Sequence, residues 1–493
     1  MTYTGLISFA VRLSSVFTGI IFTLIVTREL SQDEFGTWSL IGGLLLYVVT
    51  IDFVISYWVT REIARDIESG RTAIISGMVL SIGGVLAYLL IVYLVGMGTD
   101  ANQDILYFAT ILIPVMFVND IIHYMNAGWK PQIVSYGFFV SEITKVPAAL
   151  ILVYLLQMGL HGAILATFIS YIASILLHVV YGRKKLRSSF QKKFLKKWFK
   201  LSWLPLYQSI PNVAFVSDVV IFSIMTGSVI GAAYMTAART ISNVVMHASV
   251  ISDAIYPKLL GGGREEHLQE NLIKMLYFSI PLLCLTIVLS RPGLFALNPA
   301  YENAYIIVVI TSLRSFLSIL NRMFHSALQG IEKIDLDENA TFKRYVKSKL
   351  FFMPTLRVLQ YCSYAIILII GLFIIKGYDF LDLVTYWAVT SLIIEIPFIF
   401  ILYYMVKKNV IFKMDKIAIA KYVFTSLLSF GILYLLTEKF LNYKISIFQF
   451  LPDLLMFTGV GIFLYLGITY ATDNKTRQLF SAIISEFRHK RVD

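Results

Sequence analysis

Long apolar runs recur along this chain, and they constrain its fold more than any other feature. Each run has about 20 residues, the length that an α-helix needs to cross the roughly 30 Å hydrocarbon core of a bilayer. Membrane-spanning β-strands are about ten residues long and alternate between polar and apolar side chains, which these runs do not do. With 58% of its residues hydrophobic, the sequence predicts an all-α polytopic membrane protein.

The runs predict about fourteen transmembrane helices. No small-residue cleavage site follows the first run, so we expect it to be a retained helix rather than a signal peptide. The predicted helices span residues 5–27, 38–60, 73–96, 105–127, 133–156, 160–182, 201–226, 229–256, 273–290, 304–328, 350–375, 382–405, 417–438 and 451–471.

The basic residues indicate which way the helices run. An even number of helices puts both termini on one side, and the connections of that side carry thirty-one Lys and Arg residues against five on the other. Cytoplasmic loops carry the excess of Lys and Arg in membrane proteins. We therefore expect a multi-pass protein of the cell membrane with both termini in the cytoplasm, and the net charge of +12 describes topology rather than a nucleic-acid partner.

Nine of these cations, and no acid, lie in RKKLRSSFQKKFLKKWFK, residues 183–200. Leu186, Phe190, Phe194 and Trp198 recur every four positions in it, which predicts an amphipathic helix lying on an anionic lipid leaflet. The main interpretation is a topology determinant and interfacial anchor, and a specific ligand site is the alternative.

This basic segment also divides the chain into two lobes. EFGTWSLIGG (34–43) and VIGAAYMTAA (229–238) both place a Gly before an aromatic residue near the start of a helix. The similarity suggests two parallel six-helix repeats with a substrate cavity between them. The predicted organisation is an N-terminal lobe (1–182), a basic amphipathic cytoplasmic linker (183–200), a C-terminal lobe (201–405), helices 13 and 14 (406–471) and a cytoplasmic tail (472–493).

Polar side chains form stripes along several predicted helices. Charge inside a bilayer is costly unless it is paired or faces water, so the stripes predict a shared hydrophilic cavity. Interhelical hydrogen bonds would also explain many of the Ser and Asn residues. The candidate substrate-binding residues are Arg12, Arg239, Asn243, His247, Arg314, Arg322 and His325.

Acidic residues inside the predicted helices are candidates for coupling transport to a proton or another ion. They are Asp52, Asp120, Asp218 and Glu395, of which Glu395 has no obvious partner in the sequence. Glu142 and Lys145 lie three residues apart on one helix, where they can neutralise one another.

Other motifs are absent. The two cysteines lack Cys/His spacing and predict neither a disulfide nor a zinc site. No P-loop, G-x-S-x-G or H-E-x-x-H sequence occurs, which argues against an ATP-driven pump. We expect no enzyme activity, no bound cofactor and no metal, with energy from a proton or sodium gradient or from the membrane potential.

Four segments resemble the oligosaccharide flippases, the polysaccharide transport branch of the multidrug/oligosaccharidyl-lipid/polysaccharide (MOP) exporter superfamily. They are RLSSVFTGIIFTLIVTRELSQDEFGTWSLIGGLLLY (12–47), ISYWVTREIAR (55–65), IGAAYMTAARTI (230–241) and SALQGIEK (326–333).

This resemblance implies a two-lobe, alternating-access exporter that moves a polyprenyl-pyrophosphate-linked glycan to the outer leaflet. It implies cationic cavity residues at Arg12 and Arg239, whereas Arg314 and Arg322 rest on the stripe alone. The expected partners are a lipid-linked oligosaccharide, membrane lipids and polysaccharide-assembly proteins, without nucleic acid.

Two other functions stay open. A multidrug or small-molecule exporter of the same superfamily would favour an acidic or aromatic cavity. A membrane glycosyltransferase or polymerase would need an outer catalytic loop, and the predicted outer loops are short.

Overall fold

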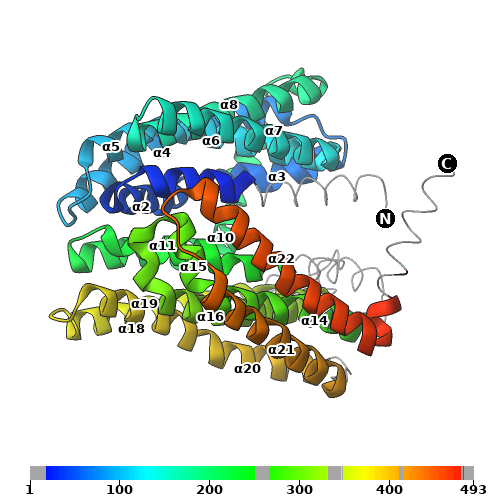
Figure 1. The fold of residues 1–493 in the computed structure, drawn as a ribbon. Helices are drawn as coiled ribbons and strands as arrows, with labels where there is room; N and C mark the ends of the chain where they lie inside the picture. Colours follow the sequence, from blue (N-terminus) through cyan, green and yellow to red (C-terminus); the bar gives the residue numbers. More distant parts are fainter. Residues whose placement is uncertain are drawn as a thin grey trace. The chain divides into compact units, whose positions relative to one another are not determined.

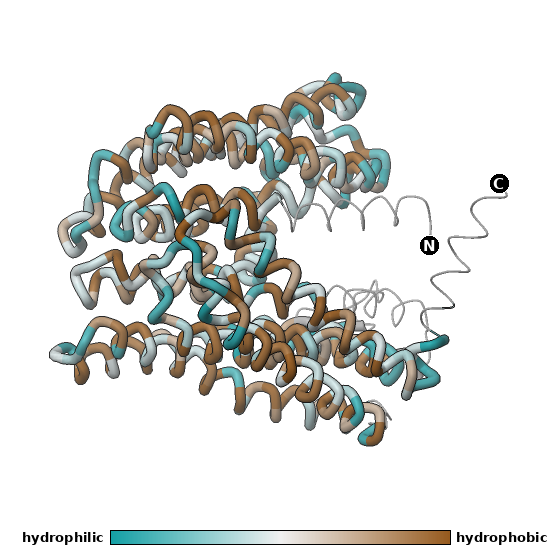
Figure 2. The backbone as a smooth tube through the Cα atoms, viewed as in Figure 1, coloured by the Kyte–Doolittle hydropathy of each residue, from teal (hydrophilic) through white to brown (hydrophobic). Residues whose placement is uncertain are grey.

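The computed structural model describes residues 18–249, 266–330, 346, 348–409, 415–478 and 481. This part of the chain is helical and contains no β-strand (Figure 1). Twelve of its helical segments are long and apolar enough to cross a membrane. Figure 2 shows hydrophobic residues along these helices and hydrophilic residues mainly near their ends. The predicted class, an all-α polytopic membrane protein, is confirmed.

The twelve segments correspond to predicted helices 2 to 7 and 9 to 14. The first predicted helix begins outside the described residues and is helical from 18 to 29. The eighth is described as α11 (Ile230–Met246), which has 17 residues and carries Arg239 and Asn243. The predicted count of about fourteen is consistent with this arrangement.

Two compact units make up the chain, and neither is continuous in sequence. Unit 1 contains Met1–Ala237 and Pro354–Thr390, and unit 2 contains Ala238–Met353 and Ser391–Asp493. The chain passes between the units within α11, within α18 (Lys349–Ile374) and within α19 (Phe380–Ile393). The predicted lobes rest on sequence symmetry rather than on compactness, so their boundaries remain a prediction.

Unit 1 holds most of the helices of the first half of the chain. The span Gln32–Ala64 is one transmembrane segment interrupted by a short 3-10 turn, Thr50–Asp52. This segment consists of α2 (Gln32–Val49) and α3 (Phe53–Ala64). The helices that follow it in the first half of the chain are α4 (Gly70–Gly96), α5 (Gln103–Phe108), α6 (Leu112–Trp129), α7 (Pro131–Ala149) with a π-helical end (Leu150–Leu155), α8 (Gly159–Leu186), α9 (Lys192–Lys200) and α10 (Trp203–Thr226).

Local sequence signals explain where α2 begins. The Ser31 hydroxyl accepts from the Glu34 N–H at 3.2 Å, and the Glu34 carboxylate accepts from the Ser31 N–H at 3.0 Å. This reciprocal pair is a capping box, which satisfies backbone donors that the helix itself cannot.

A Cβ at Gly36 would lie 2.2 Å from the Val229 carbonyl oxygen. The two similar segments, 34–43 and 229–238, therefore touch where a side chain would not fit.

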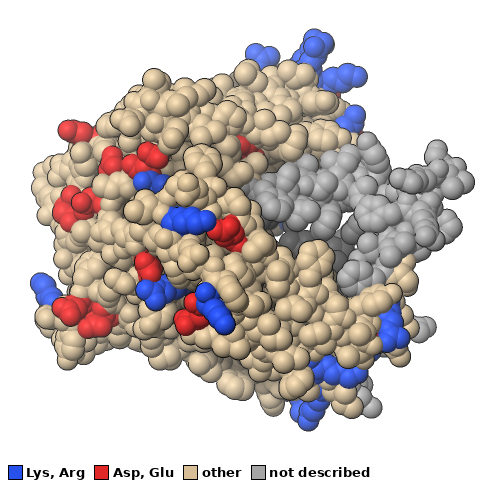
Figure 3. All heavy atoms as spheres, in the orientation of Figure 1, with Lys and Arg blue, Asp and Glu red and all other residues tan. Residues whose placement is uncertain are grey.

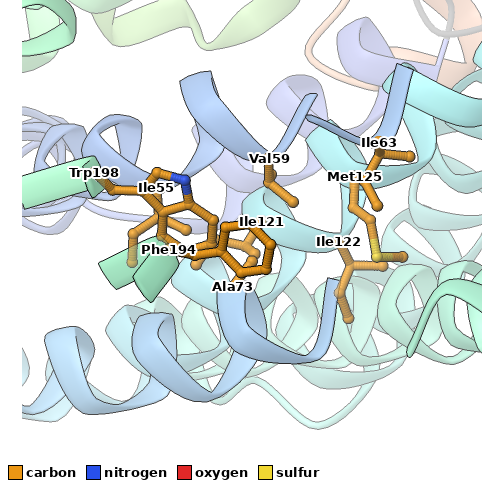
Figure 4. Packing of buried hydrophobic residues seen from close by; sticks show 9 residues of the cluster. All are labelled: Ile55, Val59, Ile63, Ala73, Ile121, Ile122, Met125, Phe194 and Trp198. Atoms are coloured by element: carbon orange, nitrogen blue, oxygen red, sulfur yellow. The ribbon is translucent and has the colours of Figure 1, made fainter. Parts of the chain in front are cut away.

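The basic segment is partly as predicted. Residues 183–186 complete α8, and the amphipathic helix is the shorter α9. Two of its apolar side chains, Phe194 and Trp198, do not enter lipid as expected, because they are buried in a cluster with side chains of α3, α4 and α6 (Figure 4). The other buried members are Ile55, Val59, Ile63, Ala73, Ile121, Ile122 and Met125. The protein core offers this face the same apolar burial that lipid would.

Unit 2 is built around α14, α16 and the last helices. Helix α14 packs along α21, and α16 packs along α20. Three tyrosines, Tyr277, Tyr422 and Tyr465, join α14, α21 and α22 through ring contacts and a hydrogen bond from the Tyr465 hydroxyl to the Tyr277 carbonyl. The helices are α14 (Glu266–Val288), α15 (Ser290–Leu297), α16 (Tyr305–Gly330), α20 (Glu395–Asn409), α21 (Lys416–Phe440) and α22 (Ile447–Thr472).

Candidate functional site

A polar cavity of about 350 Å³ lies among α6, α7 and α8 of unit 1. Its size is at the lower end of the range for small-molecule sites, about 300–1,000 Å³, and suits one compact group. The lining side chains are mostly polar or aromatic although all three helices span the membrane. They are Asn119, Asp120, His123, Tyr124, Phe138, Ser141, Glu142, Lys145, Thr167, Ser170, Tyr171 and Ser174.

Helix α6 carries one of the predicted polar stripes, and its Asn119, Asp120 and His123 all face this cavity. The Asn119 amide donates to Asp120 Oδ1 at 3.1 Å, and its own buried Oδ1 has no partner among the described residues. Asp52 is buried close by and accepts from the Ser56 hydroxyl at 3.0 Å. Asp52 and Asp120 are near enough to repel one another. The structure thus brings together two of the four acids proposed for ion coupling.

Glu142 and Lys145 line the same cavity from α7, and both also engage the first helix. The Thr18 hydroxyl donates to Glu142 Oε2 at 3.0 Å, and Lys145 Nζ lies 4.0 Å from the centre of the Phe22 ring. The two charges do attract one another. Mutual neutralisation is therefore only part of their role, because they also hold the first helix beside the cavity.

A second histidine, missed in the sequence, lies behind the cavity wall. The His123 and His178 rings are 5.8 Å apart, and His178 Nδ1 lies 2.8 Å from the Ser174 carbonyl oxygen. His178 packs so closely on α7 that a Cβ at Gly137 would lie 1.8 Å from its ring. The available signal was the three-to-four spacing of Thr167, Ser170, Ser174 and His178 along predicted helix six.

The chemistry of this cavity suits a hydroxyl-rich ligand. Carboxylates, an amide oxygen and hydroxyls accept or donate hydrogen bonds, and the Phe138 and Tyr171 rings offer apolar faces. Asp120 and Glu142 outnumber the single cation, Lys145. A phosphate would meet net repulsion there, whereas a sugar ring would not.

Unit 2 contains a separate charged cluster around Glu395, at the first turn of α20. Glu395 is 3% exposed, and Arg314 of α16, 13% exposed, places its Nη2 at 3.6 Å from Glu395 Oε1. The Ser318 hydroxyl donates to Oε1 at 2.9 Å, and the Asn321 amide donates to Oε2. The predicted stripe of α16 is thus the partner that Glu395 lacked in the sequence. Part of that stripe therefore forms interhelical hydrogen bonds between α16 and α20.

The other candidate residues lie in different surroundings. Arg12 is outside the described residues. Arg239 is half-buried on α11, Asn243 and His247 are exposed, and α16 packs against the turn His247–Ser249 that follows α11. On α16 itself, Arg322 is exposed and His325 is half-buried. Their assignment to a substrate site remains a prediction.

Asp218 ties three helices of unit 1 together. Its Oδ2 accepts from the Tyr364 hydroxyl of α18 at 2.8 Å and from the Trp387 indole of α19 at 3.0 Å. The indole also donates to the Tyr364 oxygen at 2.8 Å. This arrangement uses the carboxylate as a hydrogen-bond acceptor between α10, α18 and α19. In the described part of the chain, no group of three or more His, Cys, Asp or Glu side chains is placed to hold a metal ion.

Solved structures share this fold. A lipid II flippase, MurJ, in an inward closed conformation aligns over 96% of this chain and 100% of its own, with a TM-score of 0.66 and 15% sequence identity. An inward-facing multidrug resistance MATE family transporter of the MOP superfamily aligns over 81% of this chain and 98% of its own, with a TM-score of 0.59 and 14% identity. No curated protein sequence matches the chain.

The helices, the polar cavity and these similarities define a multi-pass membrane protein with the fold of the MOP transporters. The sequence profile described as "Polysaccharide biosynthesis protein" matches residues 5–260, which is more than half of the chain. The chain belongs to this polysaccharide biosynthesis protein family, as the resemblance of its sequence segments predicted.

Proposed function

We propose that this protein flips a polyprenyl-pyrophosphate-linked oligosaccharide from the cytoplasmic to the outer leaflet by alternating access, for surface polysaccharide or glycan assembly. The observation that carries the proposal is the match of residues 5–260 to a polysaccharide biosynthesis family. The fold shared with a lipid II flippase over 96% of the chain supports it. A glycan and a pyrophosphate cannot cross hydrocarbon unaided, whereas the polyprenyl tail can stay in lipid.

The proposed substrate has two kinds of polar group, uncharged sugars and a charged pyrophosphate, and each requires a different kind of site. We assign sugar binding to the cavity of α6, α7 and α8, whose acids outnumber its cations. We assign pyrophosphate binding to Arg12 and Arg239, because a guanidinium is always charged and binds phosphate oxygens in pairs. Glu395 already balances the charge of Arg314. We therefore expect Arg314 to contribute less to pyrophosphate binding than Arg12 and Arg239.

The driving force for outward movement follows from the charge of the substrate. A membrane potential that is negative inside favours export of an anion by about 2.3 kcal/mol per net charge per 100 mV. Asp52, Asp120, Asp218 and Glu395 are the candidates for coupling to a proton or sodium ion. The hydrogen bonds of Asp218 and Glu395 to neighbouring helices favour a structural role for these two, which leaves Asp52 and Asp120 as the better candidates.

The proposal is tested by reconstitution. Proteoliposomes containing a labelled polyprenyl-linked oligosaccharide in the inner leaflet are exposed to an external glycosidase, and the rate of label release is measured. We expect release to exceed that of protein-free vesicles. Equal rates would refute the flippase function.

Arg239 provides the matched variants for this assay. Arg239→Ala should lower the flipping rate by about tenfold or more, a loss of ~1.4 kcal/mol in transition-state stabilisation. Arg239→Lys keeps the charge but loses paired contacts, so its rate should be intermediate. Arg291→Ala removes an exposed arginine paired with Glu302 and should leave the rate unchanged. Full activity in Arg239→Ala would remove this residue from the mechanism.

A small-molecule exporter is the second candidate, favoured by the similarity to a multidrug transporter and by the acids and aromatic rings that line the cavity of α6, α7 and α8. The same vesicles loaded with a cationic dye separate the two functions, because an exporter of cations would release the dye and leave the oligosaccharide inside. A glycosyltransferase or polymerase would instead change the length of the labelled glycan, which chromatography of the product detects.

A further inference from the structure

Most of the cations in the basic segment 183–200 make no ion pair within the part of the chain that the structure describes. Of its nine, Lys185 pairs with Asp66 at 3.2 Å and Lys197 pairs with Glu62 at 2.9 Å, which leaves seven. All seven side chains are exposed, and none makes an ion pair with an acid in the described part of the chain. We call this set the cationic surface: Arg183, Lys184, Arg187, Lys192, Lys193, Lys196 and Lys200.

Several contacts hold the cationic surface in place. The apolar side of α9 is occupied, since Phe194 and Trp198 are packed in the core of unit 1 (Figure 4). Before α9, the Gln191 N–H donates to the Thr72 hydroxyl at 3.0 Å, and the Arg71 N–H donates to the Ser188 hydroxyl at 3.3 Å. The cations therefore project from a docked helix rather than from a loose loop.

The position of the segment along the chain sets its depth in the membrane. It joins the end of the span Gly159–Leu186 to the start of the span Pro205–Thr226, so it lies where hydrocarbon gives way to headgroups. Exposed aromatic side chains lie in the segment or directly after it, namely Phe190, Phe199 and Trp203. Aromatic side chains of this kind gather at headgroup level in membrane proteins. In Figure 3, Lys and Arg side chains gather at the end of α8 on the face shown.

We propose that the cationic surface binds the headgroups of anionic phospholipids. Seven cations without an acid among them match a layer of headgroups that each carry a net negative charge. The contact is mainly electrostatic, because Phe194 and Trp198 of α9 are buried in protein and cannot insert into the acyl chains. This property does not depend on the flippase function, since it needs no substrate.

The test compares lipid selectivity in the full-length protein and two quadruple variants. Spin-labelled phosphatidylglycerol and phosphatidylcholine are each added to phosphatidylcholine vesicles containing the protein, and the immobilised fraction gives their relative affinity. The test variant is Lys192→Gln, Lys193→Gln, Lys196→Gln and Lys200→Gln. Its matched control removes four exposed lysines at the ends of α20 and α21, by Lys407→Gln, Lys408→Gln, Lys416→Gln and Lys421→Gln.

We expect the wild type to prefer phosphatidylglycerol and the test variant to lose about half or more of that preference. The control should keep it, and Lys→Arg at the four test positions should also keep it because the charges remain. High salt should weaken the wild-type preference, since exposed charges are screened. All substituted lysines are exposed, and the pair Lys197–Glu62 and the buried Trp198 are left intact.

Two results would overturn the proposal. An equal loss in the test and control variants would show a general charge effect rather than a surface formed by residues 183–200. Unchanged lipid selectivity together with slower flipping in the test variant would assign these cations to the substrate's pyrophosphate instead of to membrane lipid. A negative result in the flippase assay would refute the proposed transport function but not the binding of anionic lipid, because the lipid measurement needs no substrate.

Discussion

At the scale of single residues, buried carboxylates connect the helices. Asp218 offers one oxygen to both Tyr364 and Trp387, which come from two other helices. A buried donor that loses its acceptor costs more than a hydrogen bond normally contributes. The bonding of Asp218 therefore predicts how two substitutions at this position will differ.

Asp218→Ala should destabilise the protein by about 1–3 kcal/mol, because the Tyr364 hydroxyl loses its acceptor in a buried place. Asp218→Asn retains an acceptor oxygen and should cost less. Thermal unfolding in detergent measures both. If Asn proves as harmful as Ala, the negative charge rather than the hydrogen bond is what the site requires, and an ion-coupling role regains support.

Glu395 and Arg314 form a buried pair whose members depend on one another. Glu395→Ala should cost about 3–5 kcal/mol, since it leaves a guanidinium buried without its counter-charge. Replacing both with Met should recover part of that loss, and a double-mutant cycle measures the coupling. Additive effects of the two single substitutions would show that the pair at 3.6 Å contributes nothing.

At the scale of elements, α9 is held by one side of its surface. Trp198→Ala should destabilise unit 1 by about 3–5 kcal/mol, because a large buried side chain leaves a cavity. Phe199→Ala, one position on and 51% exposed, should change stability by less than about 0.5 kcal/mol. Unfolding temperatures of the two variants decide the matter, and similar values would contradict the docked position of α9.

The start of α21 should respond to acid. Asp415 accepts from Lys475 at 2.5 Å and from the Ala418 N–H at 3.0 Å, and these hydrogen bonds lower the pKa of its carboxyl group. A lowered folded-state pKa stabilises the protein above the unfolded-state pKa, and this stabilisation is lost as the pH falls through the folded-state value.

We therefore expect the unfolding temperature of the wild type to fall more steeply on acidification than that of Asp415→Asn. Asn keeps the helix cap but cannot titrate. Scans across the acidic range compare the two proteins, and parallel curves would mean that Asp415 contributes no pH dependence.

Helix positions were predictable from sequence, whereas contacts between helices were not. Each transmembrane run carries its own signal in its length and hydropathy, so the ends of the twelve spans agree with the predictions to within six residues. Glu395 lies 74 residues from Asn321 and 77 from Ser318, and no local pattern encodes such a pairing. The sequence also could not show whether lipid or protein buries the apolar face of α9, because both environments favour the same spacing of apolar residues.

For the whole molecule, the uneven distribution of Lys and Arg predicts the direction of every span. Lys376 and Lys408 lie near opposite ends of the span Phe380–Asn409, and both are exposed. In a variant lacking Cys284 and Cys362, Lys408→Cys should react with an impermeant maleimide only from the cytoplasmic side. Lys376→Cys should react only from outside, and the reverse pattern would invert the whole topology.

The docking of α9 also restricts how α10 can move. Only Leu201 and Ser202 separate the two helices, and backbone hydrogen bonds from both residues to Lys197 and Phe199 continue across the joint. Because this connection is so short, a rotation of α10 about its own axis would also rotate α9. Such a rotation would require Trp198 to leave the core. Bending at Pro211, inside α10, leaves Trp198 in place. The N-terminal end of α10 is therefore fixed by α9, and the helix can bend only beyond this end, at Pro211.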